Sequence, residues 1–504
     1  MGIQSMMDRD LMVQSIADVP QWDVCIIGGG ATGLGTALQS AAGGLKTILL
    51  EQDDFAKGTS SRSTKLIHGG VRYLQQGNIK LVKEALIERG LLLQNAPHLV
   101  HNLRFVIPSY HWWERPFYWI GLKLYDRLAG KLGLGDSAML SKAQTLEYLP
   151  TISSKGLRGG VLYHDGQFDD ARLAISIAQT AATLGATLLN HFPVTSLIKT
   201  EGRLTGVTAT DALTGLPVQI SSKVVINATG VFTDAILRMN RPKHRSIIRP
   251  SQGVHLVVDQ KFLPRESAIL VPRTDDGRVL FAVPWHNRVI LGTTDTSVET
   301  VSLEPKPMDQ EIDLILRNLG KYLLHVPQRS DVKSVFAGLR PLVKGTAKKT
   351  AALSRGHVII KSKSGLFTVT GGKWTTYRKM AEDVVKRISK KGRLNRELAD
   401  TRSLALHGHD LPVLPFHIEG MTDDELTLRI RQAIESEMCM TVEDFLSRRT
   451  RQLLLDARVA IEKAPRVAEL MAEILGKDQS WIDLQIRSFQ EVAKHHIPDF
   501  KLNS

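Results

Sequence analysis

The sequence predicts an α/β protein with three parts: a Rossmann-like nucleotide-binding domain, a largely antiparallel second sheet and a C-terminal helical domain. Three observations support this prediction. A glycine-rich loop stands between a buried strand and a helix near the N-terminus, the middle of the chain is rich in strands, and the pattern becomes helical beyond about residue 400. With 504 residues, the chain exceeds the size at which a single core stops growing.

Composition and charge narrow the class of protein. The chain is 43% hydrophobic and 23% charged, which is typical of a globular protein. A net charge of +14 favours nucleic acid, an anionic membrane or a phosphorylated small molecule as partner. Because basic residues are scattered among acids and no nucleic-acid module is recognisable, we expect no nucleic acid. The two cysteines provide neither a disulfide framework nor a zinc site, so we expect a reducing cytoplasm and no metal.

The first 20 residues lack the apolar run of a signal peptide and are expected to form a loose leader. The uncharged run from Val24 to Leu45 is long enough to span a bilayer. Because this run is rich in glycine and fits the nucleotide-binding pattern, we expect no transmembrane helix.

Trp22 to Gln52 reads as strand, glycine loop, helix and second strand. Gly28 permits the tight turn, Gly30 lets the backbone approach a pyrophosphate, and Gly33 lets the helix press onto the strand. The helix N-terminus would then face the phosphates with its amides. Glu51 ends the second strand at the spacing expected for a ribose-binding acid.

Two further observations favour FAD as the cofactor. The Glu51 carboxylate would repel a 2′-phosphate, which favours FAD or NAD over NADP. The segment "KVVINATG", ending in Gly230, reads as a buried strand that returns to the nucleotide site, as in two-domain FAD enzymes. No second GxGxxG unit for a nicotinamide cofactor is present.

Later segments supply the remaining elements. Val279 to Asp295 predicts a hairpin that turns near His286 and Asn287. The segment "TVTGGKWTTYRK" predicts a strand, the Gly371-Gly372 pair and a helix that starts near Thr375 and Thr376. With Gly372 and Lys373 beside it, this helix start suits an anion or the edge of a flavin ring.

The C-terminal region predicts helices only. Thr422 and Glu425 form a capping box at the start of one of them. The basic run "LSRRTRQ" is interpreted as the solvated face of another helix.

Seven segments occur in an order that resembles the bacterial FAD-dependent glycerol-3-phosphate dehydrogenases, the aerobic respiratory type. They are the glycine loop, "STKLIHGGVRYL", "VVINATG", "VPWHNRVILGTTDT", "SVFAGLRPL", "TGGKWTTYRK" and "TVEDFLSRRTRQLLLDAR". The resemblance runs from about residue 20 to the C-terminus. It implies a glycine-oxidase-like FAD-binding domain, an antiparallel-sheet substrate cap and a C-terminal helical domain.

The expected division has three parts. Residues 1–20 are the leader, residues 21–400 form the FAD-dependent oxidoreductase unit, and residues 401–504 form the C-terminal helical domain. Within the unit, we expect the FAD-binding domain at about 21–110, 150–240 and 335–395, with the cap at about 240–335.

The resemblance also implies a reaction, the oxidation of sn-glycerol 3-phosphate to dihydroxyacetone phosphate, with electrons passed through FAD to a membrane quinone, ubiquinone or menaquinone. By the family pattern, Arg72 and Arg340 bind the phosphate, for which the planar arginine fork is suited. Tyr73 would add a hydroxyl donor. Two positions depart from the common pattern: Gln252 stands where lysine is frequent, and Trp374 stands where leucine is commoner.

The remaining chemistry needs a base and a well-placed flavin. His255 is the preferred base because an imidazole titrates near neutrality, and His68 is the alternative. Lys373 is expected near flavin and substrate, where it could stabilise negative charge on the reduced flavin.

Ser63 to Asn78 follows the glycine loop and is expected to cross from the cofactor's phosphates toward the flavin ring. Gly69 and Gly70 would let the backbone approach the cofactor closely. His68 is expected beside the cofactor if it is not the base. Ser60, Ser61 and Lys65 are expected to bind the cofactor's phosphates or to shape the loop.

His111 to Gly135 combines clustered aromatic residues with a basic i, i+4 row formed by Lys123, Arg127 and Lys131. This pattern suits a helix lying on an anionic membrane surface, and it also suits a partly buried helix of the cap. We expect a cytoplasmic enzyme bound peripherally to the inner face of the cytoplasmic membrane, with a homodimer left open. The competing interpretation is another FAD-dependent amine or 2-hydroxyacid oxidase of the same fold.

Overall fold

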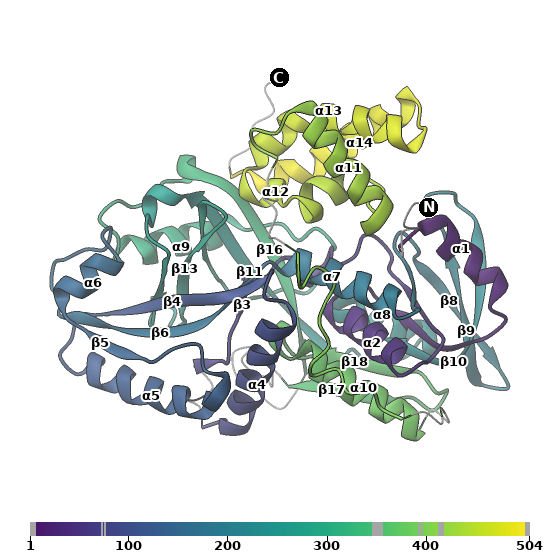
Figure 1. Cartoon of the computed structure of the whole chain (residues 1–504), viewed down its shortest axis with the longest axis horizontal. Helices are drawn as coiled ribbons and strands as arrows, with labels where there is room; N and C mark the ends of the chain where they lie inside the picture. The colour runs from purple at the N-terminus through teal and green to yellow at the C-terminus, as the bar shows by residue number, and fades with distance from the viewer. Residues whose placement is uncertain are drawn as a thin grey trace.

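Two sheets and a group of helices organise the protein. The computed structural model describes residues 7–71, 74, 77–344, 356–391, 394, 397–411 and 418–498. In Figure 1 the larger sheet lies on the left, the nucleotide-binding sheet on the right, and the C-terminal helices above the junction between them.

The nucleotide-binding sheet is built on five parallel strands. In spatial order they are β7 (Thr187–Leu189), β2 (Thr47–Leu50), β1 (Trp22–Ile27), β10 (Pro217–Asn227) and β18 (Phe367–Gly371). Three antiparallel strands extend it: β8 (Val194–Thr200), β9 (Arg203–Thr210) and β17 (His357–Lys361). The flanking helices include α2 (Ala31–Ala42), α7 (Asp170–Thr183), α8 (Thr233–Asn240) and α10 (Tyr377–Lys391). Strands β1 and β2 are apolar because a parallel sheet is buried on both faces, and the predicted Rossmann-like fold is confirmed.

The second sheet has ten strands and carries the predicted cap. Its strands are β3 (Leu66–Ile67), β4 (Val100–Ser109), β5 (Ala138–Leu140), β6 (Gly159–Phe168), β11 (Ile248–Asp259), β12 (Ser267–Val271), β13 (Leu280–Trp285), β14 (Arg288–Gly292), β15 (Thr296–Ser297) and β16 (Val332–Val343). Helices α4 (Ile79–Asn95), α5 (Glu114–Ala129), α6 (Lys142–Tyr148) and α9 (Asp309–Gly320) pack on it. The predicted hairpin is β13–β14, and its turn residues His286 and Asn287 both have positive φ.

The structure corrects the predicted boundaries of the cap. Strands β4, β6 and β16 lie in segments expected in the FAD-binding domain, yet all three belong to the second sheet. β6 pairs with β4 along its whole length, and β4 continues the ladder to β12. Their sequences show only that they are strands, because the partner that each one selects is distant in the chain.

The predicted loose leader is also wrong for the part that the structure describes. Residues Arg9–Asp18 form helix α1, which begins at an N-cap where Asp8 accepts a hydrogen bond from the Leu11 amide at 3.1 Å. Met12 is buried in the core, and Arg9 forms an ion pair with Asp211 at 2.8 Å. These contacts hold α1 against the nucleotide-binding domain.

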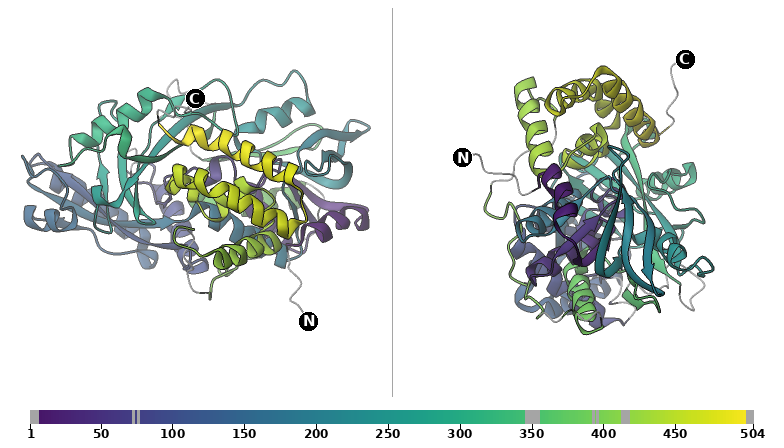
Figure 2. Two further views of the ribbon diagram at one scale, coloured as in Figure 1. Left: turned by 90° about the horizontal axis from the view of Figure 1, so that it is seen from above. Right: turned by 90° about the vertical axis from the view of Figure 1, so that its right-hand side faces the viewer.

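The C-terminal helices have their own apolar core and lie across the junction of the two sheets (Figure 2). They are α11 (Asp423–Glu437), a π-helical turn (Asp444–Arg449), α12 (Gln452–Leu455), α13 (Ala457–Leu475) and α14 (Gln479–Ala493). The capping box of Thr422 and Glu425 is present at the start of α11. None of the helices in the described ranges is both long and apolar enough to cross a membrane.

The basic run before α12 is buried, which contradicts its interpretation as a solvated face. Arg449 and Arg451 are 0% exposed. Arg449 donates to both carboxylate oxygens of Asp54 at 2.7 and 2.9 Å, and Arg448 donates to the same carboxylate at 2.5 Å. Burial of so many charges requires acidic partners, and Asp54 lies almost 400 positions away in sequence, so no local pattern could reveal it.

We expect Arg449→Met to lower the free energy of unfolding by about 3–5 kcal/mol, because it leaves the buried Asp54 carboxylate short of a partner. Urea denaturation followed by tryptophan fluorescence would measure this. Arg466→Met is the matched control, because Arg466 pairs with Asp423 on the surface and its loss should change stability little. Equal stability of the two variants would contradict a structural role for the buried arginines.

Candidate active site

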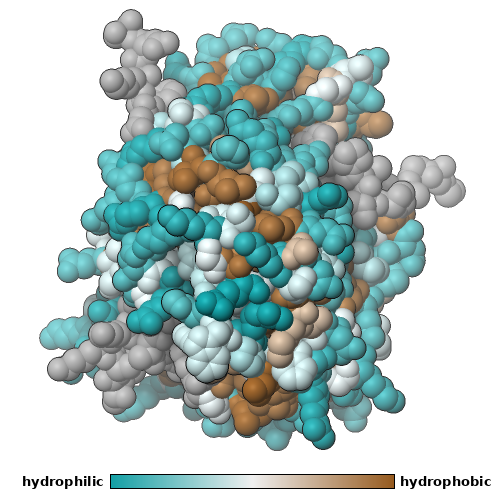
Figure 3. Space-filling view, turned by 90° about the vertical axis from the view of Figure 1, so that its left-hand side faces the viewer, coloured by the Kyte–Doolittle hydropathy of each residue, from teal (hydrophilic) through white to brown (hydrophobic). Residues whose placement is uncertain are grey.

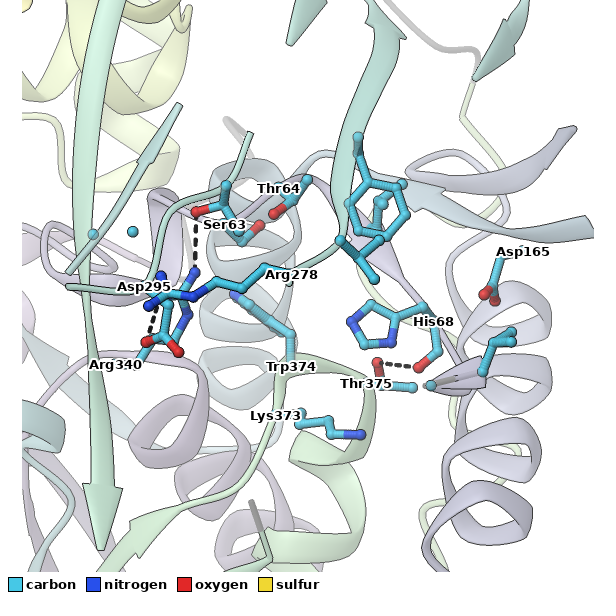
Figure 4. Close-up of a pocket in the computed structure, with 18 of the residues that line it drawn as sticks. Ser63, Thr64, His68, Asp165, Arg278, Asp295, Arg340, Lys373, Trp374 and Thr375 are labelled. Atoms are coloured by element: carbon cyan, nitrogen blue, oxygen red, sulfur yellow. Dashed lines mark hydrogen bonds and ion pairs between the residues drawn. The ribbon is translucent and has the colours of Figure 1, made fainter. Parts of the chain in front are cut away.

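A cavity of about 370 Å³ lies where the two sheets meet. Its walls come from the segment after the glycine loop, from β11 and β16, from the β12–β13 loop, and from the segment that leads into α10 (Figure 4). One part of the wall is polar and cationic. The other part is apolar and is formed by side chains of the cap, namely Phe105, Ile107, Tyr163, Leu270 and Phe281.

Glycines keep the strand surface beneath the cavity open. The antiparallel ladder of β11 and β16 places Ser251 opposite Arg340 and His255 opposite Phe336, so Arg340 and His255 share a face. Gly253 lies between them on that face, and a Cβ there would stand 2.3 Å from the Arg340 guanidinium. A Cβ on Gly292 of β14 would similarly stand 2.4 Å from the His255 ring. Both side chains therefore depend on glycine neighbours for their positions.

His255 is buried at 2% exposure and stacks on Phe336 with ring centroids 4.8 Å apart. Its Nε2 is 2.9 Å from the Thr64 hydroxyl. Burial holds the pKa of His255 well below its usual value, and the positive charges of Arg340 and Lys65 act in the same direction. The imidazole is therefore uncharged at neutral pH and able to accept a proton.

Arg340 lies on β16 at the wall of the cavity. Its guanidinium donates to the Thr293 hydroxyl at 3.0 Å and lies 3.6 Å from the Asp295 carboxylate. The Asp295 contact is long for an ion pair, so an anionic ligand could compete with it. Lys373 lines the same cavity from the other domain.

The segment before α10 supplies several of the predicted residues. Gly372, Lys373 and Thr375 line the cavity, and the Thr375 hydroxyl donates to the His68 carbonyl at 3.2 Å. Gly372 has φ +82°, and a Cβ there would meet the Met380 sulfur at 2.3 Å, so the position requires glycine. Thr376 is buried, and its hydroxyl donates to the Lys373 carbonyl at 3.3 Å, so it braces the turn.

The glycine loop at the start of α2 fits a dinucleotide. A Cβ on Gly28 would stand 2.7 Å from the Ala228 carbonyl oxygen, and a Cβ on Gly33 would stand 1.8 Å from that of Gly28. The Gly29 amide donates to the Glu51 carboxylate at 2.5 Å, and burial raises the pKa of Glu51 to about 7. The loop therefore presents a buried acid beside close-packed backbone, as a ribose and pyrophosphate require.

Other predicted cofactor residues border this loop. Gly30 is the N-cap of α2, and the Ser60 hydroxyl accepts a hydrogen bond from the Ala31 amide at 3.0 Å. Gly230 follows β10 with φ +56°, and the space where its Cβ would lie is open. Ser61 contributes its carbonyl oxygen to Lys65 at 2.6 Å. FAD fits this set of residues, and the chemistry that it supplies when bound is acceptance of a hydride.

The segment from Ser63 onward is organised differently from the prediction. Lys65 does not line the cavity; it is wholly buried and pairs with Asp170 at 2.7 Å, which favours a loop-shaping role over contact with phosphates. A Cβ on Gly69 would meet Leu86 and Tyr125 at 2.5 Å, so Gly69 serves packing there. Gly70, with φ +85°, and His68 line the cavity instead. Arg72 and Tyr73 lie outside the described residues.

The cavity also contains residues that the sequence reasoning did not single out. These are chiefly Arg62, Thr64, Asp165, Arg278, Thr293 and Asp295. Thr293 and Asp295 stand in the "GTTD" segment at the end of the predicted hairpin, and that position could have indicated them. Arg278 stands in a hydrophilic loop with no recognisable motif. The unusual Gln252 and Trp374 have structural partners: Gln252 donates to Glu311 at 2.8 Å and Trp374 to the Ser60 carbonyl at 2.8 Å.

The fold and the cavity together define an FAD-dependent oxidoreductase. Residues 23–378 match the family described as FAD dependent oxidoreductase, and residues 421–481 match the C-terminal domain of alpha-glycerophosphate oxidase. The crystal structure of glycine oxidase from Geobacillus kaustophilus shares the fold, with a TM-score of 0.56 at 19% identity and coverage of 77% of this chain and 99% of that one. The glycine-oxidase-like fold and the FAD cofactor are therefore confirmed.

More similar proteins narrow the family. The mitochondrial glycerol-3-phosphate dehydrogenase of Homo sapiens is 38% identical over 96% of this chain and 74% of its own length. That of Schizosaccharomyces pombe is 36% identical over 94% and 87%, respectively. The structure of the glycerol-3-phosphate dehydrogenase from Bacillus halodurans complexed with FAD has a TM-score of 0.81, 29% identity, and coverage of 99% of this chain and 100% of that one. The chain belongs to the FAD-dependent glycerol-3-phosphate dehydrogenase family.

We expect Gly33→Ala to prevent stable FAD binding, because its Cβ would overlap the Gly28 carbonyl and push α2 away from the loop. The flavin-to-protein absorbance ratio of the purified protein would measure this. Gly121→Ala is the control: it also places alanine in a helix, but nothing lies within 4 Å of the new Cβ. Full flavin content in the Gly33 variant would show that the close packing is dispensable.

Proposed function

We propose that this enzyme oxidises sn-glycerol 3-phosphate to dihydroxyacetone phosphate on FAD and passes the electrons to a membrane quinone. The observation that carries the proposal is the composition of the cavity wall, where Arg340, Arg278 and Lys373 accompany an uncharged, buried His255. A phosphate dianion needs such cations, and an alcohol oxidation needs a neutral base.

Arg340, His255 and Lys373 would each have a separate role in the reaction. Arg340 would bind the substrate phosphate together with Arg72 and Tyr73, the two predicted ligands that lie outside the described residues. His255 would accept the hydroxyl proton, and FAD, when bound, would supply the acceptor for the hydride of the carbinol C–H bond. The C–O bond becomes the carbonyl of dihydroxyacetone phosphate. Lys373, on the segment leading into α10, would place a positive charge beside the cofactor and so favour its acceptance of the hydride.

The alternative is an amine or 2-hydroxyacid oxidase of the same fold. Both candidates would use the same nucleotide site, so the fold does not separate them. The cations of the cavity favour the phosphorylated substrate, since an oxidase of small amino acids does not need several cations in one pocket.

The test compares glycerol 3-phosphate with glycerol at a soluble quinone analogue, using FAD-loaded enzyme. We expect kcat/KM for glycerol to be lower by at least about 100-fold, because glycerol lacks the charge-assisted hydrogen bonds of the phosphate. Equal values would exclude a phosphate pocket. Rapid peroxide formation in air without the quinone would favour the oxidase instead.

A quinone acceptor requires contact with a membrane, and helix α5 supports that contact. Trp112 and Phe117 are 75% and 54% exposed, and Ile120 is 64% exposed. Lys123, Arg127 and Lys131 supply basic groups on the same segment. Leu128 is partly buried against the cluster that contains Leu86 and Tyr125, so it does not belong to the exposed apolar face. Figure 3 shows apolar patches among hydrophilic residues on this end of the molecule.

Helix α5 is also connected to the cavity. Its Tyr118 lines the apolar wall, and the Tyr125 hydroxyl accepts a hydrogen bond from the Gly69 amide at 2.8 Å. We infer that the apolar wall beneath α5 faces the route by which a quinone would reach the flavin. We propose that the enzyme is bacterial and is bound peripherally to the inner face of the cytoplasmic membrane. Its oligomeric state in this proposal is either a monomer or a homodimer.

We expect the double substitution Trp112→Ser and Trp113→Ser to weaken binding to anionic liposomes by at least about tenfold, because both side chains would enter the interface. Co-sedimentation would measure the bound fraction. Leu428→Ser is the matched control, since Leu428 is 69% exposed on the C-terminal helices, away from α5. Undiminished binding of the tryptophan variant would move the docking surface elsewhere.

A further inference from the structure

The cations of the cavity are not equally available to a ligand. Among the described residues that line it, the permanent cations are Arg62, Arg278, Arg340 and Lys373. The guanidinium of Arg62 is engaged within the protein: it donates to the Lys57 carbonyl at 3.2 Å, the Ala337 carbonyl at 3.3 Å and the Glu304 carboxylate at 2.6 Å. It therefore has little capacity left for a substrate.

Arg278 stands in a hydrogen-bonded turn between β12 and β13. The Thr274 amide donates to the Arg278 carbonyl at 2.8 Å, and the Arg278 amide donates back to the Thr274 hydroxyl at 3.0 Å. Gly277, with φ +77°, permits the tight reversal between them. The Asp275 amide donates a hydrogen bond to the Asn318 side-chain oxygen on α9 at 2.9 Å, which connects the turn to the cap. These hydrogen bonds define the backbone conformation at Arg278.

The Arg278 side chain is only weakly held. Its Nε lies 3.4 Å from the Asp276 carboxylate, and both side chains are about 30% exposed. Within the described ranges, its two terminal nitrogens make no hydrogen bond. An ion pair this long and exposed contributes little, so exchange of Asp276 for a dianion is favourable.

The Arg278 side chain points into the cavity. Figure 4 shows Arg278 extending across the cavity toward Arg340 and Asp295. Two guanidinium groups reach the same cavity, one from β16 and one from the β12–β13 loop. Such a pair suits a tetrahedral dianion better than a single carboxylate. A planar fork can meet two phosphate oxygens at once.

We propose that Arg278 is a substrate-binding residue that takes the phosphate of glycerol 3-phosphate together with Arg340. The assignment rests on the proposed function. It places the phosphate on the cap side of the cavity and leaves the carbinol end for His255 and the flavin.

The test is steady-state kinetics of FAD-loaded Arg278→Gln. We expect KM for glycerol 3-phosphate to rise about 10- to 100-fold, the range of one or two charge-assisted hydrogen bonds. We expect kcat to change less than KM, and competitive inhibition by inorganic phosphate to weaken in parallel. Arg278→Lys should recover part of the affinity, because it keeps the charge and loses the fork. Flavin content and melting temperature should match those of the unmodified enzyme.

Arg273→Gln is the control, since Arg273 is an exposed residue of the same loop that does not line the cavity. An unchanged KM in Arg278→Gln would overturn the assignment, and so would an equal rise in KM for glycerol. If the unmodified enzyme oxidised no glycerol 3-phosphate, the proposed function itself would fail. The two failures are therefore distinguishable.

Discussion

The buried ion pair between Lys65 and Asp170 holds the point at which the chain passes between the two sheets. Lys65 precedes β3 of the cap, and Asp170 begins α7 of the nucleotide-binding domain. Burial lowers the pKa of Lys65 and raises that of Asp170, so removal from water opposes the charging of both groups. The hydrogen bonds from Lys65 and from the Ser63 hydroxyl to Asp170 compensate for that cost. Because Thr64 lies between these residues and contacts His255, the geometry of the proposed base depends on the same pair.

The C-terminal region forms ion pairs with the loop that precedes Lys65 in the chain. Asp54 follows Glu51, the predicted ribose ligand, by three positions and forms ion pairs with Arg448 and Arg449. Lys57, in the same loop, pairs with Glu443 at 2.8 Å. The loop that contains Asp54 and Lys57 lies next to the glycine-rich turn. It is therefore held by the C-terminal region, which follows the whole oxidoreductase unit in sequence. This arrangement gives a physical reason for the C-terminal region, which lies away from the cavity, to matter for the cofactor.

The cavity combines closely packed strands with a lining that is cationic in one part and apolar in another. Glycines on β11 and β14 let Arg340 and His255 project from the strands without displacing the sheet. Burial, together with the positive charges of Arg340 and Lys65, holds the pKa of His255 low. Arg278 and Arg340 line the cavity where a dianion would be stabilised. The apolar wall continues toward α5 and its exposed aromatic residues.

The sequence by itself determined the elements with local signatures. The glycine loop with Glu51, the His286–Asn287 hairpin and the capping box at Thr422 depend on neighbours within a few residues, and the motif order was enough to identify the family. Only the tertiary structure decided which strands build the cap, that Arg448 to Arg451 are buried, that Lys65 turns inward, and that Gly70 and Arg278 face the cavity. Each of these depends on partners far away in the chain. Hydrophobic periodicity and turn chemistry report the local conformation of the backbone, but whether a charge is solvated, paired or aimed at a ligand is set by what the fold places opposite it.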